Sequence, residues 1–144
     1  MYSEKVLDHF MDPRNMGELE DPSCVGTIGD GTCGDVVRIY LRMDEEHVIC
    51  DAGFRTYGCA CAVACSSMAT ELLIGRTVPE ALELTAEELT EALDGLPEEK
   101  LHCAEASEEA VRAALWDYAQ KHHLGIPGLV RPASVVSDYD FEEE

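Results

Sequence analysis

Seven cysteines are the residues of this 144-residue chain with the clearest chemical potential. They are Cys24, Cys33, Cys50, Cys59, Cys61, Cys65 and Cys103. Thiolates bind soft and borderline metals, so such a set favours zinc, copper(I) or an iron–sulfur cluster. The odd count disfavours a disulfide framework, and the lack of a Cys-x-x-Cys pair disfavours a thiol redox enzyme.

Three of these thiols fall where predicted elements begin or end. Cys33 precedes a strand, Cys59 follows a strand and precedes a helix, and Cys103 opens the last long helix. Side chains at element ends can converge at one tip of a sheet. A helix N-terminus also stabilises a thiolate, which predicts reactive thiols at Cys59 and Cys103. Spacing alone leaves a second interpretation open, in which each cysteine is a small buried apolar residue.

The elements that must position these thiols begin with a short helix and a small sheet. The periodicity predicts a helix over residues 4–11, and glycines and prolines then predict a loop over 12–35 with a short edge strand at 25–28. β-branched runs predict strands at 36–43 and 47–56. Because only three acidic residues separate these two runs, we expect an antiparallel hairpin.

Helical signals dominate the rest of the chain. Residues 60–74 have a helical period and are followed by Gly75. Capping boxes beginning at Thr77 and Thr85 predict two short helices, and residues 103–122 predict a long one. The expected fold is therefore α+β, with a small three-stranded antiparallel sheet and helices packed on one face.

Length and charge limit what the chain can be. It carries 30 acidic and 10 basic side chains, a formal net charge of −20, which disfavours binding to nucleic acid or anionic membranes. No apolar run is long enough for a membrane span, and the start lacks the features of a signal peptide, so we expect a cytoplasmic protein. We expect one domain over residues 1–126 and a mobile acidic tail over 127–144.

Several separated motifs occur in a recognisable order. They are residues 5–10 with Pro13-Arg14-Asn15, then Cys33-Gly34-Asp35, residues 54–59, residues 66–71, residues 95–97 and residues 100–103. Together they resemble the U-type iron–sulfur cluster assembly scaffolds, the family of IscU and the N-terminal domain of NifU. The resemblance implies a scaffold without turnover of its own. On it a cluster, usually [2Fe–2S], is built from iron and from sulfur supplied by a cysteine desulfurase, then passed to apo-proteins.

The resemblance also implies a set of site residues. Cys33, Cys59 and Cys103 correspond to the cluster-ligating and sulfur-accepting thiols, and Asp35 or His102 corresponds to a fourth ligand. A carboxylate or an imidazole suits a soft cluster less well than a fourth thiolate does, so we expect the cluster to be held loosely.

A zinc-bound sulfur acceptor, as in the SufU relatives, is the alternative. It would use the same three thiols with Asp35 in a tetrahedral site, and zinc is also expected to occupy the empty site of a scaffold. The His102-Cys103 pair and the absence of an insertion between Thr85 and Leu96 favour the scaffold.

The chain departs from the family pattern at three places. Asp30-Gly31 replaces an Asn-Pro pair before Cys33, which predicts a more flexible and more acidic loop. Glu98-Glu99 replaces the Pro-Val pair that many members present to an Hsp70-type chaperone, so chaperone binding is not expected. Cys61 and Cys65 replace small residues on one helical face; they either pack or add ligands, and added ligands would favour a [4Fe–4S] cluster or tighter retention.

The remaining chemical groups are predicted to be structural. We expect Cys24 and Cys50 to pack in the interior, His9 to have a structural role and Trp116 to pack on the long helix. The acidic stretch over residues 80–109 is either a solvated face or a surface for a basic patch on a desulfurase. Homo-oligomerisation is left open.

Overall fold

The computed structural model describes residues 2–29, 36–132 and 135. Its elements, in chain order, are α1 (Glu4–Met11), β1 (Cys24–Gly29), β2 (Val36–Met43), β3 (Ile49–Tyr57), α2 (Ala60–Leu73), α3 (Val78–Leu82), α4 (Ala86–Ala92), a 3-10 turn η1 (Glu98–Lys100) and α5 (Leu101–His122).

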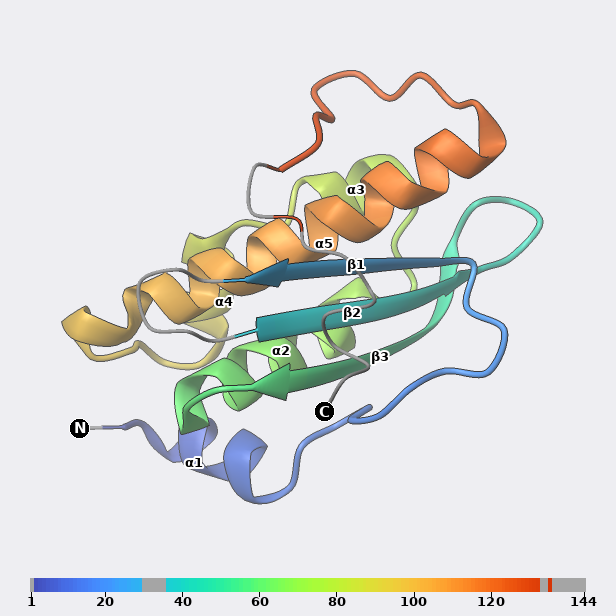
Figure 1. Cartoon of the computed structure of the whole chain (residues 1–144). Helices are drawn as coiled ribbons and strands as arrows, with labels where there is room; N and C mark the ends of the chain where they lie inside the picture. Colours follow the sequence, from blue (N-terminus) through green and yellow to red (C-terminus); the bar gives the residue numbers. More distant parts are fainter. Residues whose placement is uncertain (1, 30–35, 133–134, 136–144) are drawn as a thin grey trace.

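The three strands form one antiparallel sheet in the order β1-β2-β3 (Figure 1). The inward side chains of the central strand, Val37, Ile39 and Leu41, are fully buried. The α+β class and the hairpin are confirmed. β3 begins two residues later than predicted because the turn extends past His47, which has a positive φ of 64°.

The two long helices cover the same face of this sheet (Figure 1). α5 lies along β1 and also contacts β2, while α2 lies along β3 and contacts α5. α1 packs on α2, and α3 and α4 pack against α5. The helices therefore form a layer on one side of the sheet, as predicted.

The approach of β1 to α5 depends on one glycine. A Cβ atom added at Gly26 would lie 2.2 Å from the backbone nitrogen of Ala114 and 2.6 Å from the carbonyl oxygen of Ala110. The strand backbone therefore rests directly on the helix backbone, which is possible only without a side chain at this position.

Capping fixes the ends of the short helices. At α3 both halves of the capping box form. The Thr77 hydroxyl accepts a hydrogen bond from the backbone N–H of Glu80, and the Glu80 carboxylate accepts one from the backbone N–H of Thr77. At α4 only Thr85 caps, because the Glu88 carboxylate binds Arg76 at 2.6 Å instead. The second predicted capping box is therefore only half formed.

α5 also differs slightly from its prediction. It begins at Leu101, two residues early, directly after η1, and it ends at His122 as predicted, with His123 as a C-cap in the left-handed conformation. Cys103 consequently lies in the first turn of α5. Among the described helices, none is long and apolar enough to cross a membrane.

Candidate thiol site

Cys59 and Cys103 meet at one end of the molecule. Cys59 is the N-cap residue of α2, directly after β3 and Gly58, and Cys103 is in the first turn of α5. Their Sγ atoms are 3.5 Å apart although 44 residues separate them in the chain. The prediction that these two thiols converge at element ends is confirmed.

An imidazole lies beside this thiol pair. The His102 Nε2 atom is 3.7 Å from the Cys103 Sγ atom, close enough for a weak hydrogen bond to sulfur. His102 is half-buried and Cys59 is half-buried, whereas Cys103 is only 1% exposed. The accessible side of the group is therefore formed by Cys59 and His102.

Cys33 and Asp35 lie outside the described residues. The two ends of their loop are described: Gly29 pairs with Val36 across β1 and β2, and Val36 pairs with Tyr57 on β3. Because Tyr57 precedes Cys59 by two residues, Gly29 and Val36 lie at the end of the sheet where the thiols meet. Within residues 2–29, 36–132 and 135, no three His, Cys, Asp or Glu side chains are grouped so as to hold a metal ion.

Cys61 and Cys65 lie on the first turns of α2, next to this pair. Both are fully buried. Burial raises the pKa of each thiol, and the neighbouring Cys59 raises the pKa of both further. The Tyr2 side chain forms a hydrogen bond with Cys61, which lowers the pKa of Cys61 in part. The structure thus places four cysteines in one neighbourhood, three of them buried and only Cys59 partly exposed.

Burial dominates the acidity of Cys103. Its pKa is raised, first by desolvation and then by its hydrogen bond to Cys59. Burial therefore opposes the predicted stabilisation of a Cys103 thiolate by the helix N-terminus. The pKa of Lys100 is raised, chiefly by its interaction with Cys59. Sequence reasoning included Lys100 in the motif over residues 100–103 but gave this cation no role at the site.

The other cysteines do not join the site. Cys24 is fully buried on β1, as predicted. Cys50 is exposed, which corrects its prediction as a packing residue; it follows the turn at the start of β3, and its Sγ atom contacts the carbonyl oxygen of Arg42 at 3.4 Å. A side chain on the outer face of a strand is packed only where another segment covers it.

His9 has the predicted structural role. Its Nδ1 atom is 2.7 Å from the Ser67 hydroxyl, and its Nε2 atom is 3.5 Å from a Glu71 carboxylate oxygen. It therefore joins α1 to α2 and does not face the thiols. Burial, followed by the charge of Arg14, lowers the pKa of His9.

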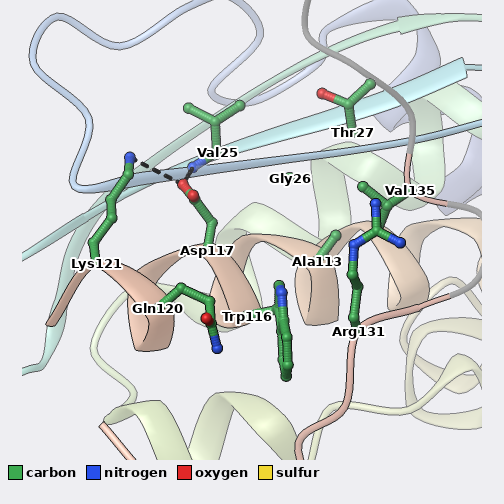
Figure 2. Close-up of a pocket in the computed structure, with 10 residues that line it drawn as sticks. All are labelled: Val25, Gly26, Thr27, Ala113, Trp116, Asp117, Gln120, Lys121, Arg131 and Val135. Carbon is green, nitrogen blue, oxygen red and sulfur yellow. Dashed lines mark hydrogen bonds and ion pairs between the residues drawn. The ribbon is translucent and has the colours of Figure 1, made fainter. Parts of the chain in front are cut away.

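A pocket of about 430 Å³ beside β1 contains no thiol (Figure 2). Trp116 lines it and is half-buried, so this side chain only partly packs as predicted. The Asp117 carboxylate accepts a hydrogen bond from the backbone N–H of Val25 and forms an ion pair with Lys121 at 3.0 Å. The carboxylate that could act as a base is therefore already engaged, and we assign the pocket no chemistry.

Comparisons with known proteins show which family the chain resembles. Residues 1–124 match the family described as the NifU-like N terminal domain. The iron–sulfur cluster assembly scaffold protein IscU 1 of Archaeoglobus fulgidus is 48% identical over 122 residues, covering 85% of this chain and 79% of that protein. The IscU scaffold protein of Aquifex aeolicus is 43% identical over 145 residues, covering 99% and 89%.

A solved structure gives the same picture of the fold. The crystal structure of a protein described as an iron–sulfur cluster assembly scaffold for the SUF system, from Fervidobacterium islandicum AW-1, superposes with a TM-score of 0.67. It is 25% identical, and the match covers 79% of this chain and 96% of that one.

Proposed function

The chain belongs to the NifU-like N-terminal domain family, and we propose that it is a scaffold on which iron–sulfur clusters are assembled and from which they are transferred. The observation that carries this proposal is the pair of Sγ atoms of Cys59 and Cys103, 3.5 Å apart, with the His102 imidazole beside them. Two thiols from different elements with a nearby imidazole form part of a ligand set for a soft metal centre.

We propose that Cys33, Cys59 and Cys103 hold the cluster and that Asp35 or His102 supplies the fourth ligand. The paired ends of the loop carrying Cys33 and Asp35 lie at the thiol end of the sheet, which supports this set. The distance from His102 Nε2 to Cys103 Sγ supports the imidazole as one candidate. A non-thiolate fourth ligand favours a cargo that can be released.

Sulfur would arrive as a persulfide on a cysteine desulfurase. The Cys59 thiolate would attack the outer sulfur atom, so that a new S–S bond forms on Cys59 while the S–S bond of the donor breaks and its cysteine leaves as a thiolate. Cys59 can do this without rearrangement because it is half-buried, whereas Cys103 must first be uncovered.

Partners and location follow from the same proposal. A desulfurase would supply sulfur and apo-proteins would receive clusters, with the protein itself acting as a carrier rather than an enzyme. We place it in the cytoplasm, where free thiols stay reduced. The acidic residues at 98 and 99 do not favour a chaperone partner.

The zinc-bound sulfur acceptor remains the second candidate because a SUF-system structure shares the fold. Such a protein would bind zinc tightly at Cys33, Asp35, Cys59 and Cys103 and would retain no sulfide. The position of His102 beside Cys103 favours the scaffold.

The deciding experiment is anaerobic reconstitution with iron, cysteine and a desulfurase, followed by iron and sulfide analysis and Mössbauer spectroscopy. We expect a [2Fe–2S] spectrum with equal iron and sulfide, which Cys59→Ser should abolish. Tight zinc binding without sulfide would support the alternative instead.

Cys61 and Cys65 provide the matched control in the same experiment. We propose that both pack, since both are fully buried and Cys61 already binds Tyr2. The double variant Cys61→Ala with Cys65→Ala should therefore keep the wild-type spectrum. A lost spectrum, or a wild-type protein that holds a [4Fe–4S] cluster, would make them ligands.

A further inference from the structure

A groove of about 280 Å³ lies next to the thiol site, between α4 and the first turns of α5. It is lined by Ala86, Glu87, Thr90, Glu91, Leu101 and Glu105. Leu101, which is 41% exposed, immediately precedes His102 and Cys103 in the chain. The volume of the groove is at the lower limit of the roughly 300–1,000 Å³ of typical small-molecule sites, so one or two side chains of another protein would fill it.

The carboxylates at the rim of this groove are not neutralised. Among the described residues, the side chains of Glu87, Glu91 and Glu105 make no ion pair or hydrogen bond. The neighbouring acids differ, because Glu88 pairs with Arg76 at 2.6 Å and Glu108 pairs with Arg112 at 3.2 Å. Glu88 and Glu108, beside the groove, therefore have ion-pair partners among the described residues, whereas the three glutamates of the rim do not.

No cation of the chain is directed to the rim from the adjacent turn. Lys100 precedes Leu101, but its strongest interaction is with Cys59, on the thiol side. The groove thus combines apolar side chains of Ala86 and Leu101 with a negative rim that favours a positively charged partner.

We propose that this groove binds a segment of a partner protein that presents an apolar side chain between basic ones. The apolar side chain would bury Leu101, and lysines or arginines on either side would pair with the three rim carboxylates. Burial provides the affinity, and the charges increase the rate of encounter and fix the orientation.

The position of the groove indicates what the partner does, and this step rests on the proposed function. Leu101 and Cys103 are both in the first turn of α5, but positions i and i+2 lie on different sides of a helix, so a partner anchored in the groove lies beside the thiol site. Such an anchor suits a protein that delivers sulfur at the neighbouring thiol site.

The test uses two synthetic helical peptides as probes with the full-length, cluster-free protein. One carries a stripe of leucines flanked by lysines, and in the other each leucine is replaced by serine. We expect the leucine peptide to shift the NMR signals of Ala86, Thr90 and Leu101, and the serine peptide to bind about tenfold more weakly. The substitution Leu101→Ala should weaken binding of the leucine peptide to a similar extent. Shifts spread over the whole acidic surface, or no effect of Leu101→Ala, would overturn the proposal.

Two triple variants separate the rim from the total charge. The first removes three charges at the groove, by Glu87→Gln, Glu91→Gln and Glu105→Gln. The second removes three exposed charges elsewhere, by Glu4→Gln, Glu45→Gln and Glu46→Gln. We expect only the first triple variant to weaken binding of the leucine peptide, by about tenfold. Equal weakening by both would show that net charge alone attracts the peptide, and would contradict a groove site.

Cluster assembly from iron and inorganic sulfide, without any partner protein, keeps this proposal distinct from the proposed function. The groove variants should assemble the cluster as the wild type does, because none of the groove residues is in the ligand set. A protein that binds the peptide but forms no cluster would overturn only the proposed function.

Discussion

Cys103 shows how two local effects compete at one residue. Its place in the first turn of α5 favours the thiolate through the helix dipole, but its side chain is only 1% exposed. Desolvation raises the pKa, so the cluster-free protein keeps this group as a thiol. A nearby metal cation reverses that balance, because a coordinating thiol is deprotonated by the charge of the metal. Under the proposed function, the metal rather than the helix would therefore generate the Cys103 thiolate.

His9 provides a prediction about pH at the same scale. Its pKa is lowered, first by burial, so the folded protein favours the neutral imidazole. In the unfolded chain His9 has the ordinary histidine pKa of about 6.5, so below this pH the unfolded state binds more protons than the folded state. The free energy of unfolding therefore falls as the pH falls through that value and then through the folded-state pKa of His9. We expect thermal denaturation to show that wild type loses more stability than His9→Gln between about pH 8 and pH 5.

The exposed His123 is the control for this effect. His123→Gln should follow the wild-type curve, since this residue lies at the end of α5 and is exposed. Parallel curves for wild type and His9→Gln would contradict a lowered pKa at His9.

At the scale of elements, the contact between β1 and α5 determines where the sheet lies on the helix layer. Gly26 permits this contact because the backbones of Ala110 and Ala114 lie where its side chain would be. The same strand leads into the loop that carries Cys33, so the packing of β1 on α5 also sets one end of that loop.

Gly26→Ala should therefore destabilise the protein strongly. The added methyl group would meet backbone atoms that cannot move aside as a flexible side chain would, and we expect a loss of at least about 2 kcal/mol in the free energy of unfolding. Urea denaturation measures this loss. The matched substitution Gly125→Ala, where nothing lies within 4 Å, should cost little; equal effects of the two changes would show that the close contact does not control stability.

At the scale of the whole molecule, the net charge of −20 dominates the electrostatics. An ion pair such as Lys5 with Asp94 has two exposed members, and pairs of this kind contribute little to stability. Repulsion among the remaining acids opposes the compact state and is screened by salt.

We expect the melting temperature to rise as sodium chloride is increased from about 0.02 M to about 0.5 M, because the Debye length falls over this range. Calorimetry at neutral pH measures the change. The triple variant Glu4→Gln, Glu45→Gln and Glu46→Gln should be less sensitive to salt than wild type. A melting temperature that falls with salt would mean that attractive pairs outweigh the repulsion.

The sequence alone determined most of the secondary structure and the α+β class. Periodicity, capping residues and the acidic turn act over a few neighbours, so β2 agrees with its prediction at both ends and α2 and α5 agree within two residues. The motif order also indicated the family, and residues 1–124 match it. The roles of Cys33 and Asp35 remain predictions from that resemblance.

Only the tertiary structure decided how the thiols relate to one another. The contact between Cys59 and Cys103, the burial of Cys103 and the exposure of Cys50 depend on which distant segments cover each residue. The half-formed capping box at Thr85 has the same origin, since Arg76 binds Glu88 from outside the helix. Local patterns place a residue on an element, whereas solvent exposure and partners are set by long-range packing, which those patterns do not encode.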